Sequence, residues 1–282
     1  MTQRYATSAD GVRIAVHESG APEAPVLVAV HGFPDNHHVW DGLAGCLAGE
    51  LRFVTYDVRG AGDSDKPAGR AAYRMERLAD DLAAVLDLVS PDRPVHLLGH
   101  DWGSVQLWHP LSETRFADRV ATFTSISGPS LDHAGAWFRR GGHRAASLRQ
   151  LLASTYMLAF QLPRLPEAVL RRAPVERVAG GSFPRSEADL TNGINLYRAN
   201  VVQRVLRPRP QHVRVPVLVL APAGDPYVSL AVATQAPVPY VEDLTVQELS
   251  GGHWVLAEQP ELVAAQVRAF IDNRSAADRK QA

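Results

Sequence analysis

The sequence predicts an α/β fold in which a mostly parallel, doubly wound sheet carries an inserted helical segment. First, several short runs are apolar throughout rather than alternating, as is typical of parallel strands covered on both faces. Second, amphipathic helical patterns lie between these runs. Third, this alternation stops between residues 130 and 210, where the chain becomes rich in Arg, Leu and Ala. Alternating strands and helices imply right-handed crossovers, so a ligand site is expected at the carboxyl ends of the strands.

The strands are predicted in chain order from these apolar runs. The segment from Arg4 to His17 has an Asp10-Gly11 turn between two alternating stretches, which predicts a hairpin at the edge of the sheet. A further strand is expected near Thr245 to Leu249. The remaining strands should form the centre of the sheet and cover residues 26–30, 52–56, 95–98, 120–125 and 215–220.

Two helices of the core are clear from their patterns. Apolar residues recur at helical spacing from Met75 to Ser90, and Pro91 is expected to end that helix. A second amphipathic helix is predicted from Pro260 to Ile271. The residues from Ser275 to Ala282 are expected to be a frayed tail.

Residues 130–210 are predicted to form a helical cap inserted into a core of residues 1–129 and 211–282. Prolines at positions 163, 166, 174 and 184 should break its helices. An apolar stripe in this segment fits either the roof of a pocket or a face that docks the cap on the sheet, and docking is favoured. The stripe contains Leu148, Leu151, Leu152, Met157, Leu158 and Phe160.

Composition restricts the classes of partner. The 29 basic residues nearly cancel the 30 acidic ones and are scattered, which predicts no field that would concentrate nucleic acid or anionic lipid. A small neutral or apolar substrate fits this balance. Cys46 is the single cysteine and no Cys/His grouping has zinc spacing, so neither a metal nor another cofactor is expected.

The same features suggest a cytoplasmic protein. A lone cysteine fits a reducing compartment. The segment from Met1 to Gly11 is polar, and the longest apolar stretch is too short to span a bilayer. We expect no membrane span, and a monomer or a homodimer.

A strand, a sharp turn and a helix are predicted around Asp101. The turn contains Gly99-His100-Asp101-Trp102-Gly103. Glycines are needed where a strained turn leaves no room for neighbouring side chains, and such a turn exposes its central side chain at the start of a helix. In isolation the pattern fits a helix N-cap equally well.

Three further segments make a nucleophile the better interpretation of Asp101. His31-Gly32-Phe33-Pro34 follows the strand 26–30, so the backbone N–H of Phe33 is placed to form an oxyanion hole with that of Trp102. Asp225 and His253 each follow a later strand. Taken singly, these residues fit ordinary turns and loops. Together they give the order nucleophile, acid, histidine.

With these motifs, and with the stretch Asp57-Val58-Arg59-Gly60-Ala61-Gly62-Asp63-Ser64-Asp65, the chain resembles the α/β-hydrolase superfamily from Tyr5 to about Arg274. An Asp in the turn resembles the branch that contains epoxide hydrolases and haloalkane or haloacid dehalogenases. Ester-hydrolysing relatives normally carry Ser there, and no GxSxG occurs elsewhere in the chain. The resemblance implies an α/β-hydrolase fold with an Asp nucleophile.

The cap tyrosines favour epoxide over halide chemistry. Tyr156 and Tyr197 resemble, in position and neighbours, the two cap tyrosines of epoxide hydrolases, and an opening epoxide oxygen needs such a proton donor. Many haloalkane dehalogenases carry Asn where this chain has Phe33. Relatives often have Trp where this chain has Leu196, which affects the shape of the pocket. Trp102 also occurs in dehalogenases, so it is expected only to form part of the pocket wall and to offer its backbone N–H.

The resemblance therefore implies an epoxide hydrolase that converts a small apolar epoxide and water to a vicinal diol through an alkyl ester on Asp101. Asp225 would orient His253, the base that activates water, and Tyr156 and Tyr197 would protonate the leaving oxygen. Two alternatives stay open: a haloalkane or haloacid dehalogenase, and a non-catalytic ligand-binding relative.

Overall fold

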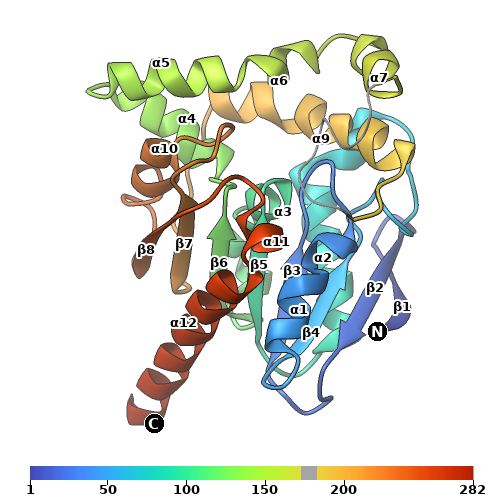
Figure 1. Cartoon of the computed structure of the whole chain (residues 1–282), viewed down its shortest axis with the longest axis vertical. Coiled ribbons are helices and arrows are strands. Elements are labelled where there is room, and N and C mark those ends of the chain that lie inside the picture. Colours follow the sequence, from blue (N-terminus) through green and yellow to red (C-terminus); the bar gives the residue numbers. More distant parts are fainter. Residues whose placement is uncertain (173–182, 282) are drawn as a thin grey trace.

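The computed structural model describes residues 1–172 and 183–281 and has one eight-stranded sheet (Figure 1). The strand order is β1-β2-β4-β3-β5-β6-β7-β8. The predicted hairpin forms the β1-β2 edge and is antiparallel, as is β2 to β4, while all later neighbours are parallel. The strands are β1 (Thr2–Thr7), β2 (Arg13–Ser19), β3 (Val26–Val30), β4 (Arg52–Tyr56), β5 (Val95–His100), β6 (Val120–Ile126), β7 (Val217–Pro222) and β8 (Leu244–Leu249).

The central strands are buried because helices cover both faces of the sheet. All residues of β3, β5 and β7 are buried. In β3, Val28 and Val30 pack in the cluster that includes α2, whereas Leu27 and Ala29 pack in the cluster on the other face. One face is covered by α2 (Met75–Val89) and α3 (Trp102–Leu107), and the other by α1 (Asp41–Leu47), α11 (Val255–Glu258) and α12 (Pro260–Gln281). The predicted doubly wound sheet is thus confirmed.

A helical cap lies over one end of the sheet (Figure 1). As predicted, it is inserted in the chain between β6 and β7. Pro166 begins a cap helix rather than breaking one, since the first turn tolerates proline, and Pro174 lies outside the described residues. We keep the division at residues 130 and 210 as a proposal. The cap helices are α4 (Leu131–Arg140), α5 (Arg144–Ala153), α6 (Thr155–Ala159), α7 (Leu165–Leu170) and α9 (Glu187–Leu206).

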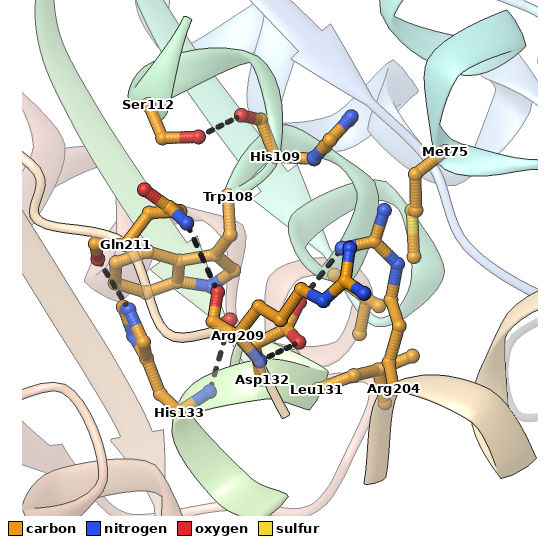
Figure 2. Close-up of a pocket in the computed structure, with 12 residues that line it drawn as sticks. Met75, Trp108, His109, Ser112, Leu131, Asp132, His133, Arg204, Arg209 and Gln211 are labelled. Atoms are coloured by element: carbon orange, nitrogen blue, oxygen red, sulfur yellow. Dashed lines mark hydrogen bonds and ion pairs between the residues drawn. The ribbon is translucent and has the colours of Figure 1, made fainter. Parts of the chain in front are cut away.

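The two ends of the cap are tied together where it leaves the sheet (Figure 2). The carboxylate of Asp132, in the first turn of α4, accepts hydrogen bonds from the Arg204 guanidinium at 2.7 Å and from the backbone N–H of Arg209 at 2.8 Å. Nε2 of His133 donates to the carbonyl oxygen of Gln211 at 2.9 Å. The cavity among these side chains is only about 30 Å³, room for about one water molecule, so these residues serve to anchor the cap.

The apolar stripe of the cap does not dock on the sheet, contrary to the prediction. Leu148, Leu151, Leu152 and Leu158 are 55–69% exposed, while Met157 and Phe160 are half-buried. The cap instead rests on α4 and α9, whose buried residues include Trp137, Leu190 and Ile194. The exposed leucines lie on α5 and α6, along the outer edge of the cap (Figure 1).

The last helix is longer than predicted. α12 continues from Pro260 to Gln281 rather than ending at Ile271, because residues 272–281 contain no Gly or Pro to stop it. No helix in the described residues combines the length and apolar character needed to cross a bilayer. The remaining short helices are η1 (His37–Trp40), η2 (Arg70–Tyr73), η3 (Pro110–Ser112), η4 (Thr114–Phe116) and α10 (Leu230–Gln235).

Candidate active site

Asp101 stands on a strained turn between β5 and α3. Its φ of 49° lies in the left-handed region, which the backbone of residues other than glycine rarely adopts. A Cβ on Gly103 would lie 1.8 Å from the carbonyl oxygen of Val30, and one on Gly99 would lie 2.5 Å from Cα of Ser104. Both glycines are therefore required for the turn to fit between the sheet and α3, as the sequence pattern predicts.

The two carboxylate oxygens of Asp101 have different partners. Oδ1 accepts a hydrogen bond from the backbone N–H of Phe33 at 2.7 Å. Oδ2 lies 3.6 Å from Nε2 of His253. The side chain retains 13% of its accessible surface and lines a cavity, so one oxygen is held by the β3 loop while the carboxylate remains open to a small molecule.

Asp225 and His253 form the expected pair behind the carboxylate. Nδ1 of His253 lies 2.8 Å from Oδ2 of Asp225, and both residues are buried. The other oxygen of Asp225 accepts the backbone N–H groups of Tyr227 and Val228 at 2.8 and 3.0 Å. This arrangement fixes the carboxylate, so the imidazole is oriented with Nε2 toward Asp101.

The charges in this group strongly favour a protonated histidine. Burial alone would lower the pKa of His253, but its contacts with the carboxylates of Asp101 and Asp225 outweigh it and raise this pKa to about 10. For Asp225, burial would raise the pKa of the carboxyl, yet its bond to His253 keeps that pKa below the ordinary value. The resting site thus holds two carboxylates and one imidazolium.

Two tyrosines reach the same cavity from the cap. Tyr156 of α6 and Tyr197 of α9 line a cavity of about 240 Å³ together with Phe33, Asp101 and His253. Their rings meet edge to face with centroids 5.9 Å apart. Burial, reinforced by nearby negative charge that includes Asp101, raises the pKa of both hydroxyls. Both phenols are therefore protonated at neutral pH and can donate hydrogen bonds.

A second cavity of about 320 Å³ meets the first at Asp101. The two share Asp101, Tyr156 and Tyr227 in their linings, and the second is otherwise almost wholly apolar. The indole of Trp102 forms part of its wall and lies edge to face with Tyr197, with centroids 4.8 Å apart. Sequence reasoning missed Tyr227, although it lies two residues after Asp225.

Sequence reasoning also missed a buried network beneath the site. Asp35, fully buried, accepts a hydrogen bond from Nε1 of Trp254 at 3.0 Å and pairs with Arg185 of the cap at 2.8 Å. Burial lowers the pKa of His100 to about 3, so its ring is neutral, and Nε2 donates to the carbonyl oxygen of His253 at 2.8 Å. The positions of Asp35, directly after Phe33-Pro34, and of His100, directly before Asp101, were the available signals.

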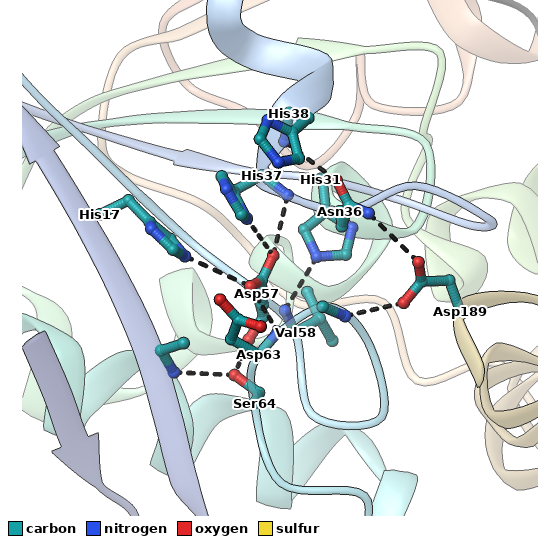
Figure 3. Close-up of polar contacts among 12 residues, drawn as sticks. His17, His31, Asn36, His37, His38, Asp57, Val58, Asp63, Ser64 and Asp189 are labelled. Atoms are coloured by element: carbon teal, nitrogen blue, oxygen red, sulfur yellow. Dashed lines mark hydrogen bonds and ion pairs between the residues drawn. The ribbon is translucent and has the colours of Figure 1, made fainter. Parts of the chain in front are cut away.

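A histidine cluster lies around Asp57, the first residue after β4 (Figure 3). In the described part of the chain, one group with atoms suited to a metal ion is found, formed by His17, His37 and Asp57. The two rings stack with centroids 3.6 Å apart and planes within 17°, so their in-plane lone pairs do not converge. Asp57 also accepts the backbone N–H groups of His37 and Asp63, each at 2.9 Å. This geometry fits a structural carboxylate that organises the loop after β4.

Comparisons with known proteins agree with the fold. A family model described as "alpha/beta hydrolase fold" matches residues 25–260. "Probable oxidoreductase EphD" of Mycobacterium tuberculosis is 38% identical over 292 residues, covering 95% of this chain but 49% of that protein. "Epoxide hydrolase A" of the same species is 36% identical over 185 residues, covering 62% of this chain and 53% of that protein. The chain thus spans about half the length of these curated relatives.

Solved structures show the same architecture. An epoxide hydrolase mutant from Bacillus megaterium, complexed with the diol product (R)-3-[1]naphthyloxy-propane-1,2-diol, has a TM-score of 0.80 at 21% identity and covers 95% of this chain and 100% of its own. "Epoxide Hydrolase A" from Mycobacterium thermoresistibile has a TM-score of 0.72 at 24% identity, covering 96% and 98%. These TM-scores establish a shared fold.

Proposed function

The chain belongs to the α/β-hydrolase fold family, and on this premise we propose that it is an epoxide hydrolase that forms a covalent alkyl ester on Asp101. The observation that carries the proposal is the meeting of three groups at one cavity. These are a carboxylate on a strained turn, a histidine whose other nitrogen is held by Asp225, and two protonated tyrosines. Among the described residues, the hydroxyl groups that line this cavity are those of Tyr156, Tyr197 and a third tyrosine, Tyr227.

In the first step, Oδ2 of Asp101 attacks an epoxide carbon and the C–O bond breaks. The leaving oxygen takes a proton from Tyr156 or Tyr197, giving a hydroxyalkyl ester. Esterification removes the negative charge of Asp101, so the pKa of His253 falls from about 10. The proton released by His253 restores the neutral tyrosine.

In the second step, neutral His253 removes a proton from water, and the hydroxide attacks the carbonyl carbon of the ester. The backbone N–H of Phe33, already 2.7 Å from Oδ1, and that of Trp102 stabilise the oxyanion. Collapse of the intermediate releases the diol and regenerates the Asp101 carboxylate beside protonated His253. The oxygen that the diol gains in this turnover comes from Oδ2 of Asp101, and the oxygen of water replaces it in the carboxylate, so atoms and protons balance over the two steps.

The tyrosines favour this reaction over the two alternatives. A departing halide needs no proton, so a dehalogenase would have no use for a pair of buried phenols beside the carboxylate. A non-catalytic receptor would have no use for the strain at Asp101. One relative is named a probable oxidoreductase, and this chain spans 49% of that protein. For the matching half we propose hydrolysis, in line with the other relatives named epoxide hydrolase.

The two cavities suggest an apolar substrate with unequal arms. The larger, apolar cavity of about 320 Å³ fits the bulkier arm, and the cavity of about 240 Å³ fits the smaller arm, with the epoxide between them at Asp101. The partners are thus a small apolar epoxide and water. A cytoplasmic location, a monomer or homodimer, and the absence of a cofactor stay predictions.

A single turnover in water enriched in heavy oxygen tests the proposal. Excess protein is mixed with a panel of aryl and alkyl epoxides, and the diol and the peptide containing Asp101 are weighed. The ester mechanism places the label in Asp101 and leaves the first-formed diol unlabelled. Label in the first diol would instead mean direct attack by water, and turnover of organohalides alone would assign the dehalogenase function.

A further inference from the structure

The charge of the chain is balanced overall but not within the cap. Residues 139–172 contain seven arginines, at positions 139, 140, 144, 149, 164, 171 and 172, and one acidic residue, Glu167. That acid is already paired with Arg198 of α9. The prediction that basic residues are scattered therefore fails for this segment, which carries a concentrated positive charge.

A hollow lined by arginines continues this charge onto α9. A hollow of about 520 Å³ is lined by Arg70 of η2, by Arg74 directly after η2, and by Arg198 and Arg207, on and directly after α9. Arg70, Arg74 and Arg207 are exposed, and within the part of the chain that the structure describes their guanidinium groups have no ion-pair partner. Their charge is thus available to an anion.

Exposed apolar side chains lie beside the arginines. Val202 is 44% and Leu206 63% exposed, and both line the arginine hollow. The same two residues line the apolar cavity, together with Leu151 and Leu158 and, at its inner end, Asp101. The cavity that joins this surface to Asp101 is therefore lined mainly by apolar side chains. Further exposed apolar residues of the outer cap are Leu148, Leu152, Leu162, Leu165 and Val169.

From this combination we propose that the outer face of the cap, formed by α5, α6, α7 and the exposed side of α9, docks on an anionic lipid bilayer. The leucines enter the boundary between headgroups and acyl chains, and the arginines contact the lipid phosphates. A second copy of this chain fits poorly, because two copies of one basic face would repel each other. Docking also lets an apolar substrate pass from the bilayer into the cavity, a consequence that rests on the proposed function.

The experiment measures binding of the full chain to vesicles without any epoxide, so its result is independent of the proposed function. Vesicles of phosphatidylcholine alone are compared with vesicles that also contain phosphatidylglycerol, at low and high salt. We expect binding to the anionic vesicles, weakened by salt. Each arginine at an anionic surface strengthens binding roughly fivefold, so the double variant Arg144→Gln/Arg149→Gln, at two exposed arginines of α5, should bind roughly 25-fold more weakly.

The matched control is Arg93→Gln/Arg214→Gln, which removes the same charge from exposed positions that precede β5 and β7, at the end of the strands away from the cap. It should bind almost as the parent does.

A second test changes the apolar residues of the face. The variant Leu148→Ser/Leu152→Ser, which leaves both cavity linings intact, should weaken binding while its thermal unfolding stays unchanged. Equal binding to both vesicle types, or equal losses in the two arginine variants, would overturn the proposal. A dimer that the leucine variant disrupts would assign this face to a second copy.

Discussion

The backbone N–H of Phe33 donates to Oδ1 of Asp101 over 2.7 Å, so one oxygen of the proposed nucleophile already occupies an oxyanion site. When Oδ2 forms the ester bond, Oδ1 becomes its carbonyl oxygen. That oxygen then stays on the same donor while water adds. In the proposed mechanism, the site is therefore organised for hydrolysis of the ester before a substrate arrives.

Loss of His253 should separate the two halves of the reaction. In His253→Gln, Asp101 can still attack the epoxide, but water is no longer activated, so turnover should fall roughly 10²- to 10⁴-fold. Mass spectrometry should find the alkylated peptide that contains Asp101. His212→Gln, at an exposed histidine, is the control and should turn over normally. A variant that neither turns over nor traps an ester, while remaining folded, would contradict the scheme.

The stability of the free protein should fall between pH 7 and 9.5. The pKa of His253 is raised from 6.5 to about 10 in the folded state, so its contribution is complete below about pH 6.5 and is lost as the pH rises toward 10. Urea unfolding at a series of pH values measures this slope. The slope should flatten in His253→Gln. An equally steep decline in that variant would assign the effect to other groups.

Much of this site could be predicted from sequence because the chemistry follows strand ends. Asp101 directly follows β5, Asp225 and His253 come within four residues of the ends of β7 and β8, and the carboxyl ends of parallel strands meet at one edge of the sheet. The glycines around Asp101 carry a steric requirement that is visible in one short motif. Such local motifs can be identified from the sequence without knowledge of the tertiary structure.

The packing of the cap could not be predicted as well, because its sequence pattern is compatible with two arrangements. A stripe of leucines at helical spacing fits either burial or an exposed face, and spacing alone does not say what lies opposite. Leu148 and Leu152 are exposed because α4 and α9 occupy the space above the sheet. The contact between Asp35 and Arg185 joins residues 150 positions apart, and no local motif encodes it.

Breaking that contact should loosen the cap. The side chains of Arg185 and Asp35 are 1% and 0% exposed, so Arg185→Gln leaves a buried carboxylate without its charge partner and should cost about 3–5 kcal/mol of unfolding free energy. Arg171→Gln removes another cap arginine, whose pair with Glu187 is exposed, and should cost at most about 1 kcal/mol. Chemical denaturation compares them. Equal losses would mean that the buried pair has no special weight.

Two substitutions of glycine by alanine should have opposite effects on the stability of the protein. Gly103→Ala places a methyl group 1.8 Å from the Val30 carbonyl oxygen, so the turn cannot hold Asp101 in place, and both stability and activity should be lost. Gly45→Ala lies in α1 with nothing within 4 Å, and should stabilise the protein by up to about 1 kcal/mol because alanine favours the helix. Thermal unfolding and epoxide turnover measure both. A fully active Gly103→Ala would refute the steric argument.

The two cap tyrosines should act as a pair that shares one task. Either Tyr156→Phe or Tyr197→Phe leaves one phenol to protonate the leaving oxygen, so turnover should fall without disappearing, whereas the double variant should lose it almost completely. Tyr5→Phe, at an exposed tyrosine 43% accessible to solvent, controls for loss of a hydroxyl elsewhere. The decisive measurement is the rate of ester formation on Asp101, since proton donation acts in that step. A double variant that forms the ester at the parent rate would remove the reason to prefer epoxides over organohalides.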